Sequence, residues 1–185
     1  SVGYLTRYSP GVRENGGVYT HAATWTVLAE AMLGRGESAY RMYSKLNPIY
    51  RGKKPDEYCA EPYVTPGNIE GPDSAFFGRG GWTWYTGSAA WLFKVGLEWI
   101  LGVRPAFDGL LLDPCIPPAW NGFKVRRTFR GATYHIEVKN PEHVQCGVKE
   151  LWVDGQRHCM TKGPRNKVVP PFAPGTTHEV VVVLG

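Results

Sequence analysis

Hydrophobic positions change their spacing about half-way along the chain, and the two spacings predict helices first and strands afterwards. Over residues 21–33 and again over 37–46, apolar side chains recur every three or four positions, as on one face of a helix. Gly34 and Gly36 separate these two helices, because glycine often ends a helix. A third predicted helix covers 86–101 and is apolar on nearly every side, which indicates burial of most of its surface.

Beyond Gly102 the spacing becomes two, which is typical of strands with one buried face. In the clearest stretch, Tyr134, Ile136 and Val138 alternate with polar neighbours. The predicted strands are separated by Gly, Pro and Asn and cover 110–112, 123–130, 133–139, 149–153 and 178–184. The expected fold class is therefore α+β, with a small antiparallel β-sheet domain at the C-terminus.

This change of pattern predicts two domains, over residues 1–104 and 105–185, with the Pro-rich stretch 113–118 as the hinge between the two halves. Two or three helices cannot close a helical domain, and the helix over 86–101 needs neighbours that the chain does not supply. We therefore expect the chain to be the C-terminal piece of a longer protein. Residues 48–84, rich in Pro, Gly and Tyr, form a long excursion, and such segments usually have a function.

Charge and composition narrow the classes of partner. The 185 residues carry a net charge of +5, from 21 Lys and Arg against 16 Asp and Glu. The densest basic residues share one predicted strand, whose side chains alternate between two faces: Lys124, Arg126, Arg127 and Arg130. No nucleic-acid-binding motif accompanies them, so we expect no nucleic-acid partner. The helix over 86–101 is shorter than the ~20 residues of a membrane span, so no membrane insertion is expected.

The cysteines are scattered along the chain as Cys59, Cys115, Cys146 and Cys159. They contain no Cys-x-x-Cys pair, and no histidine lies at zinc-ligand spacing from them, so no metal site is expected. Scattered cysteines in a chain of this size indicate buried thiols in a reducing compartment. Because no signal-peptide pattern precedes them, we predict a cytoplasmic protein.

Two loops rich in Gly and aromatic residues, at 11–20 and 78–87, each run directly into a predicted helix. Helix starts carry unpaired N–H groups and the positive end of the helix dipole, so they bind anions readily. The residues at these starts are Thr20 and His21 in one loop and Thr86, Gly87 and Ser88 in the other. Brought together, the two starts would cradle a small oxyanion such as phosphate, and the neighbouring Trp82, Trp84 and Tyr85 suit the apolar face of a sugar.

Four ordered motifs carry a family resemblance: NGGxxxH at 15–21, EPYV at 61–64, WxTGSA at 84–89 and GLxxDPCIP at 109–117. Together they resemble the C-terminal part of the glycoside hydrolase family 94 phosphorylases. The resemblance implies the last helices of an (α/α)6 barrel followed by a C-terminal β-sheet domain. It also implies an inverting enzyme that cleaves a β-glucoside with inorganic phosphate to give α-D-glucose 1-phosphate. Phosphate is then a co-substrate, and no other cofactor is implied.

When the family's binding residues are matched to this sequence position by position, the resemblance implies that His21, Thr86 and Gly87 bind phosphate. It also places Arg13 and Glu14 in the loop that lines the acceptor sugar, and we add Trp84 as a substrate contact. The family's catalytic aspartate lies on an earlier segment, so no catalytic residue is expected in this chain. The partners implied are a β-glucoside oligosaccharide, phosphate and the upstream part of the barrel. The family often forms homodimers, which makes a homodimer one expected assembly.

One position departs from the family pattern, because Gly67 stands where several members carry a glutamine near the phosphate, although Asn68 is available as a substitute. Other interpretations stay open as well. His21 and Thr86 suit simple capping of helix starts, and Trp82 and Trp84 suit a core as well as a sugar platform. Glu61 is interpreted as a buried structural carboxylate of the long excursion rather than as an acid.

Two other functions stay open beside the phosphorylase. The first is a non-catalytic carbohydrate-binding or structural module, because this chain alone lacks the family's acid. The second is a hydrolase on the same type of barrel, which needs a second carboxylate to activate water. Glu14 and Glu61 are the nearby candidates for that carboxylate. The acceptor sugar and its linkage are not fixed by the sequence.

Overall fold

A computed structural model gives the fold and describes residues 3–84, 87–160 and 167–185. Thr86, one of the predicted phosphate-binding residues, lies outside the described residues. The chain forms two compact units, and each unit is discontinuous in sequence. The first unit combines Ser1–Ala29 with Arg41–Val95, and the second combines Glu30–Tyr40 with Gly96–Gly185. These units are defined by contacts within the chain and are not continuous segments. The expected boundary between two domains at residue 104 therefore stays a prediction.

The described residues form several helices, of which some lie in stretches that the sequence predicts to be irregular. The helices are η1 (Gly3–Arg7), α1 (Thr20–Met32), α2 (Gly36–Leu46), α3 (Pro48–Arg51), α4 (Pro55–Tyr58), α5 (Ser88–Lys94) and the π-helical η2 (Val95–Ile100). The helices predicted over 21–33 and 37–46 are thereby confirmed as α1 and α2. Asn47 caps α3, because its side chain accepts a hydrogen bond from the Ile49 N–H at 2.9 Å.

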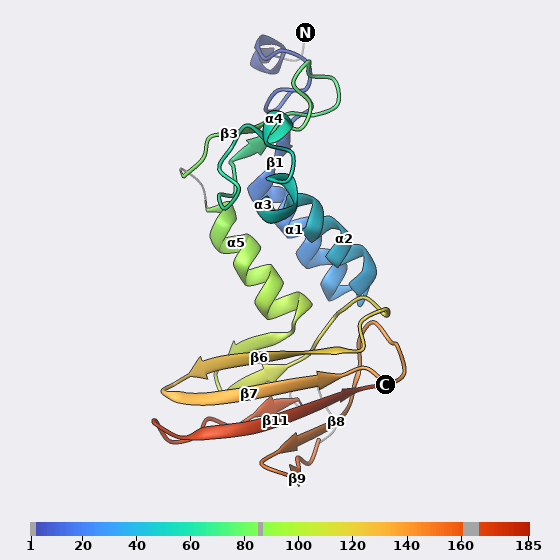
Figure 1. Ribbon diagram of the computed structural model, residues 1–185, viewed down its shortest axis with the longest axis vertical. Coiled ribbons are helices and arrows are strands. Elements are labelled where there is room, and N and C mark those ends of the chain that lie inside the picture. Colours follow the sequence, from blue (N-terminus) through green and yellow to red (C-terminus); the bar gives the residue numbers. More distant parts are fainter. Residues whose placement is uncertain (1–2, 85–86, 161–166) are drawn as a thin grey trace. The chain divides into compact units, whose positions relative to one another are not determined.

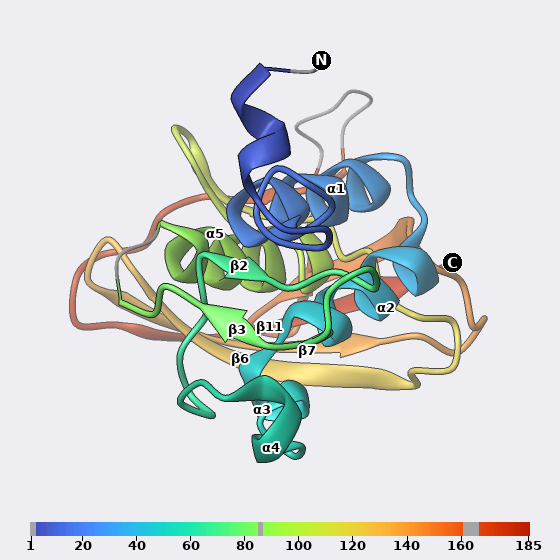
Figure 2. The ribbon, with the colours of Figure 1, turned by 90° about the horizontal axis from the view of Figure 1, so that it is seen from above.

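The first unit contains a small antiparallel sheet that closes the long excursion. It has the order β1-β2-β3, from Val18–Tyr19, Asn68–Ile69 and Gly80–Gly81. Figure 2 shows β2 and β3 running side by side. The Thr20 N–H, directly after β1, donates to the Gly67 carbonyl at 3.0 Å. This sheet therefore anchors the loop before α5 to the start of α1.

The second unit holds two further sheets. One has the order β10-β5-β4, from Val168–Val169, Gly109–Leu112 and Val103–Ala106. The larger has the order β6-β7-β11-β8-β9, from Gly122–Phe129, Ala132–Lys139, Thr177–Leu184, Val148–Val153 and Gln156–Arg157. In Figure 1, β6, β7, β11 and β8 follow one another across this sheet. All the stretches predicted as strands are confirmed, with bounds shifted by a residue or two.

The larger sheet has one buried face, as the alternating pattern predicts. Tyr134, Ile136 and Val138 on β7 are fully or almost fully buried, and so are Val180 and Val182 on β11. The expected combination of helices with small antiparallel sheets is confirmed, with one exception. Strands β7 and β11 pair in parallel, because the chain forms β8 and β9 before returning along the other edge of β7. The barrel itself stays a prediction.

Candidate functional site

A cavity of about 380 Å³ in the first unit brings together most of the residues singled out by the sequence. It is lined by Arg13, Glu14, Gly17, Tyr19, His21, Gly67, Asn68, Trp82 and Gly87. The lining residues come from the loop before β1, the start of α1, the strand β2, the segment after β3 and the residue before α5. The cavity therefore lies where the small sheet joins the two loops that precede α1 and α5.

His21 and Gly87 lie against each other in this cavity. A Cβ atom built on Gly87 would lie 3.5 Å from His21 Cε1 and 3.7 Å from Nδ1, so the imidazole packs directly beside the residue that precedes α5. Gly87 is the N-cap residue of α5 and makes no side-chain cap. The starts of α1 and α5 are thus adjacent, which is the arrangement that an oxyanion cradle requires.

The imidazole of His21 is held among aromatic rings. Its ring centroid lies 5.1 Å from Trp25, 6.0 Å from Tyr19 and 6.0 Å from Trp91. His21 Nε2 is buried and has no hydrogen-bond partner among the described residues. Buried polar groups are almost always hydrogen-bonded. A ligand or another segment of protein is therefore expected to supply the missing partner.

Arg13 forms one wall of the cavity by stacking on Trp82. Its guanidinium carbon lies 3.8 Å from the Trp82 ring centroid and 4.8 Å from that of Tyr8. Arg13 Nε also lies 3.7 Å from the Glu14 carboxylate. Because Trp82 is 59% exposed, its ring remains accessible beside the guanidinium. Stacked arginine and tryptophan next to a carboxylate give a surface that suits the apolar and hydroxyl faces of a sugar.

Tight backbone contacts fix the loop that carries Arg13 and Glu14. Arg13 has a φ of +50°, a left-handed conformation that is unusual for a non-glycine residue. The Gly17 N–H donates to the Arg13 carbonyl at 2.8 Å, and the Gly71 N–H donates to the Gly11 carbonyl at 2.7 Å. A side chain on Gly71 would overlap the Gly16 carbonyl oxygen. The loop thus has its shape because glycine allows the two backbones to touch.

The position that departs from the family pattern also reaches the cavity. Gly67 and Asn68 both line it, because the excursion returns through β2. The Gly67 N–H donates to the carbonyls of Gly81 and Trp82, at 3.0 and 2.9 Å. Gly67 has no side chain that could contact a ligand, whereas Asn68, with its side-chain amide, lines the cavity.

Trp84 lies outside the cavity that contains His21. Its indole N–H donates to Glu61 Oε1 at 2.8 Å, its ring makes an edge contact with Tyr63, and it is 69% exposed. Glu61 lines a second, more open cavity of about 820 Å³, which shares Arg13, Asn68 and Trp82 with the first. The expected burial of Glu61 is wrong: the residue is partly exposed, because it lies at the rim of this open cavity. The role of Trp84 in substrate binding stays a prediction.

Hydrogen bonds determine the protonation state of Glu61. Its own backbone N–H, then the Trp84 indole and the Thr83 hydroxyl, hold the pKa of Glu61 below its usual value. A general acid needs a raised pKa so that it keeps its proton near neutral pH. Glu61 is therefore an acceptor that positions Trp84 and not a proton donor.

The charges around the smaller cavity nearly cancel. Arg13 is the cation and Glu14 the anion among its described lining residues, and the two lie within ion-pair distance. Phosphate, the expected ligand, carries more than one negative charge, so these described lining residues alone would not neutralise it. We expect arginine or lysine side chains from another segment to complete the site. Among the described residues, no cluster of His, Cys, Asp or Glu is arranged to hold a metal ion.

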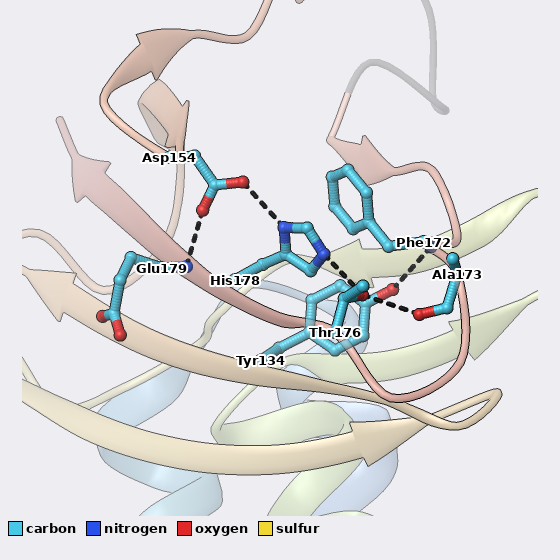
Figure 3. A network of polar contacts seen from close by, with 7 residues as sticks. All are labelled: Tyr134, Asp154, Phe172, Ala173, Thr176, His178 and Glu179. Carbon is cyan, nitrogen blue, oxygen red and sulfur yellow. Dashed lines mark hydrogen bonds and ion pairs between the residues drawn. The ribbon is translucent and has the colours of Figure 1, made fainter.

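A polar cluster in the second unit has the order of an acid, a histidine and a hydroxyl (Figure 3). His178 Nδ1 lies 2.7 Å from Asp154 Oδ2, and Nε2 lies 2.8 Å from Thr176 Oγ1. The Thr176 hydroxyl donates to the Ala173 carbonyl at 2.6 Å, and a hydroxyl has one hydrogen to give. Thr176 therefore cannot also pass that hydrogen to His178. The cluster stabilises the turn that precedes β11 and is not a nucleophilic triad.

This cluster predicts a pH dependence of folding. The His178 hydrogen bond, then the Glu179 backbone N–H, lower the pKa of Asp154. A carboxyl group with a lowered pKa in the folded state stabilises the fold fully at pH values above its unfolded pKa of about 3.9. This contribution is lost as the pH falls through the lower pKa of the folded state. We expect Asp154→Ala to cost about 1 kcal/mol or less near neutral pH, because an exposed pair is screened. Thermal melting from pH 3 to 7 should show this cost shrinking below pH 4, with the exposed Asp56→Ala as control.

Comparison with known proteins now identifies the class. The model of the glycosyl hydrolase 94 superfamily catalytic domain matches residues 1–102, and that of the glycosyl hydrolase family 65 C-terminal domain matches 103–158. The chain belongs to the glycosyl hydrolase 94 superfamily. No helix in the described ranges has the length and apolar character needed to cross a lipid bilayer.

Individual relatives are similar along most of the chain. An N,N'-diacetylchitobiose phosphorylase of Vibrio proteolyticus is 42% identical over 184 residues, which cover 100% of this chain and 22% of that protein. A solabiose phosphorylase of Paenibacillus borealis is 36% identical over 182 residues, 98% of this chain and 23% of that protein. The cyclic beta-(1,2)-glucan synthase NdvB of Rhizobium meliloti (strain 1021) is 49% identical over 139 residues, 74% of this chain and 5% of that protein. The chain thus spans about a fifth of the length of the phosphorylases.

Proposed function

We propose that this chain supplies the C-terminal part of an inverting β-glucoside phosphorylase, a hexosyltransferase. The enzyme would cleave a β-linked gluco-disaccharide or oligosaccharide with inorganic phosphate and release α-D-glucose 1-phosphate. The observation that carries the proposal is the contact between His21 and Gly87 in a cavity rimmed by Trp82. Membership of the family and the names of the similar phosphorylases add support.

In the proposed site, phosphate lies beside His21 and the start of α5, with Thr86 as a further expected contact. Phosphate attacks the anomeric carbon from the face opposite the leaving oxygen, so the configuration changes from β to α. The glycosidic C–O bond breaks, and a carboxylic acid expected on an upstream segment protonates the departing oxygen. Arg13, Glu14 and Trp84 are proposed to contact the sugar.

The described carboxylates favour phosphorolysis over hydrolysis. An inverting hydrolase needs a second carboxylate to activate water, whereas phosphate is already an anion. Glu14 is the carboxylate among the described residues lining the cavity of His21, and it lies beside Arg13 at ion-pair distance. We also keep the cytoplasm as the proposed compartment, because a charged sugar phosphate does not cross a bilayer unaided. A homodimer stays a prediction.

The decisive experiment incubates the complete protein with phosphate and, separately, cellobiose, cellobionic acid, β-1,2-gluco-oligosaccharides and N,N'-diacetylchitobiose. We expect α-D-glucose 1-phosphate, assigned by NMR, from one of the glucosides. The β anomer would overturn inversion, and free sugar without phosphate ester would indicate a hydrolase. Turnover of N,N'-diacetylchitobiose alone would retain phosphorolysis and overturn the glucoside specificity. Oligosaccharide binding without any turnover would support the non-catalytic module.

A further inference from the structure

Two cysteines of the second unit face each other across a backbone bridge. Cys115 and Cys146 form an isolated antiparallel bridge, and the Ile116 N–H donates to the Gln145 carbonyl at 2.8 Å beside it. That hydrogen bond joins the residues next to the two cysteines, so the cysteines occupy a non-hydrogen-bonded position of the pair. Cα atoms at such positions are about 4.5 Å apart, and their side chains approach closely. Disulfides need Cα distances of roughly 4.4 to 6.8 Å, so the bridge suits one.

The two thiols differ in their surroundings. Cys115 is buried, whereas Cys146 is exposed, although scattered thiols were all expected to be buried. That expectation is wrong for Cys59, Cys146 and Cys159, because each lies in a turn or loop at the surface. Burial, with smaller effects of Cys146 and Asp113, raises the pKa of the Cys115 thiol to about 12. Cys146 is therefore the thiol that an oxidant meets first.

Both cysteines line one cavity of about 360 Å³ in the second unit. Arg104, Asp113 and Lys167 line it as well, and Asp113 lies 2.9 Å from Arg104 and 2.7 Å from Lys167. Two cations against one carboxylate leave a positive charge beside the thiols. This positive charge attracts the carboxylates of an anionic disulfide such as oxidised glutathione toward the exposed Cys146.

We propose that Cys115 and Cys146 form a reversible redox site, which closes to a disulfide on reaction with oxidised glutathione. The Cys146 thiolate attacks one glutathione sulfur, its S–S bond breaks, and one glutathione thiolate leaves. Cys115 then attacks the Cys146 sulfur of the mixed disulfide and expels the second glutathione, whose departing thiolate takes up the Cys115 proton. Overall the two protein thiols are oxidised and one glutathione disulfide is reduced to two thiols. The bond would join residue 115, just after the β4–β5 hairpin, to the loop that follows β7.

The test titrates the complete protein with glutathione redox buffers, traps free thiols with an alkylating reagent and analyses the peptides by mass spectrometry. We expect a linked Cys115–Cys146 peptide whose ratio to the reduced form changes tenfold for every 30 mV, as for a two-electron couple. Reductant should restore both free thiols. The Cys115→Ser variant should accumulate mixed glutathione disulfide at Cys146, whereas Cys146→Ser should leave Cys115 unmodified.

Cys159→Ser is the matched control, since it removes an exposed thiol of the same unit and should leave the linked peptide unchanged. If a hydroxyl at the buried position unfolds the protein, Cys115→Ala replaces Cys115→Ser. Free Cys115 in every oxidising buffer would overturn the proposal, and so would linkage of Cys146 only to Cys59 or Cys159. These readouts do not involve the proposed phosphorolysis.

Discussion

Replacing His21 with alanine in the complete protein is expected to lower kcat/KM for phosphate by about 10- to 100-fold. A hydrogen bond to a charged group contributes about 1.5 to 3 kcal/mol, which corresponds to this range. The imidazole lies beside Gly87, and its Nε2 has no partner among the described residues. Its removal therefore takes a hydrogen bond from the ligand, and from the fold it takes the ring contacts with Tyr19, Trp25 and Trp91. Initial rates over a range of phosphate concentrations measure the effect.

The result separates binding from folding when two variants are added. His135→Ala removes an exposed histidine of β7 and should leave the phosphate dependence unchanged. His21→Gln retains a hydrogen-bond donor and should recover part of the loss. Thermal melting shows whether the aromatic rings around His21 still pack. A folded His21→Ala variant with wild-type phosphate dependence would contradict the assignment of His21 to phosphate.

Periodicity predicts the parts of this fold that bury one face. The long strands follow directly from apolar residues at regular spacing, because those residues pack on one side. The same spacing predicts helices α1 and α2, although Trp25 and Met32 of α1 are exposed. Strands β1, β2 and β3 have two residues each, too few for any periodicity. The π-helical turn η2 is likewise invisible in the pattern, because an α-helical turn and a π-helical turn can have the same apolar composition.

The candidate site was predictable where local sequence determines it. His21 and Gly87 stand at helix starts, which loop composition marks in the sequence, and the structure places them together. The choice between tryptophans was not predictable. Trp82 lines the cavity, whereas Trp84 donates to Glu61. Both have left-handed φ values, +56° and +70°, which no spacing rule foresees. The Cys115–Cys146 bridge depends on pairing between segments far apart in sequence and was missed for that reason.

Gly71→Ala in the complete protein is expected to lower kcat/KM for the sugar substrate by about 100-fold. The new methyl group would overlap the Gly16 carbonyl oxygen, so the loop of residues 11–17 must move away. That loop carries Arg13 and Glu14, and a shift of about 1 Å in a positioning group costs about 100-fold in rate. Overpacking also costs about 1 to 3 kcal/mol, which thermal melting would detect.

Asp73→Ala is the matched control, because it removes atoms from an exposed side chain in the same turn and should preserve activity. The double variant of Gly71→Ala with Arg13→Ala tests the mechanism of the loss. If Gly71 acts by holding the loop that presents Arg13, the two losses should not add, since the second change removes a group already displaced. Additive losses, or a folded Gly71→Ala enzyme with unchanged kcat/KM, would show that the geometry of this loop does not control sugar binding.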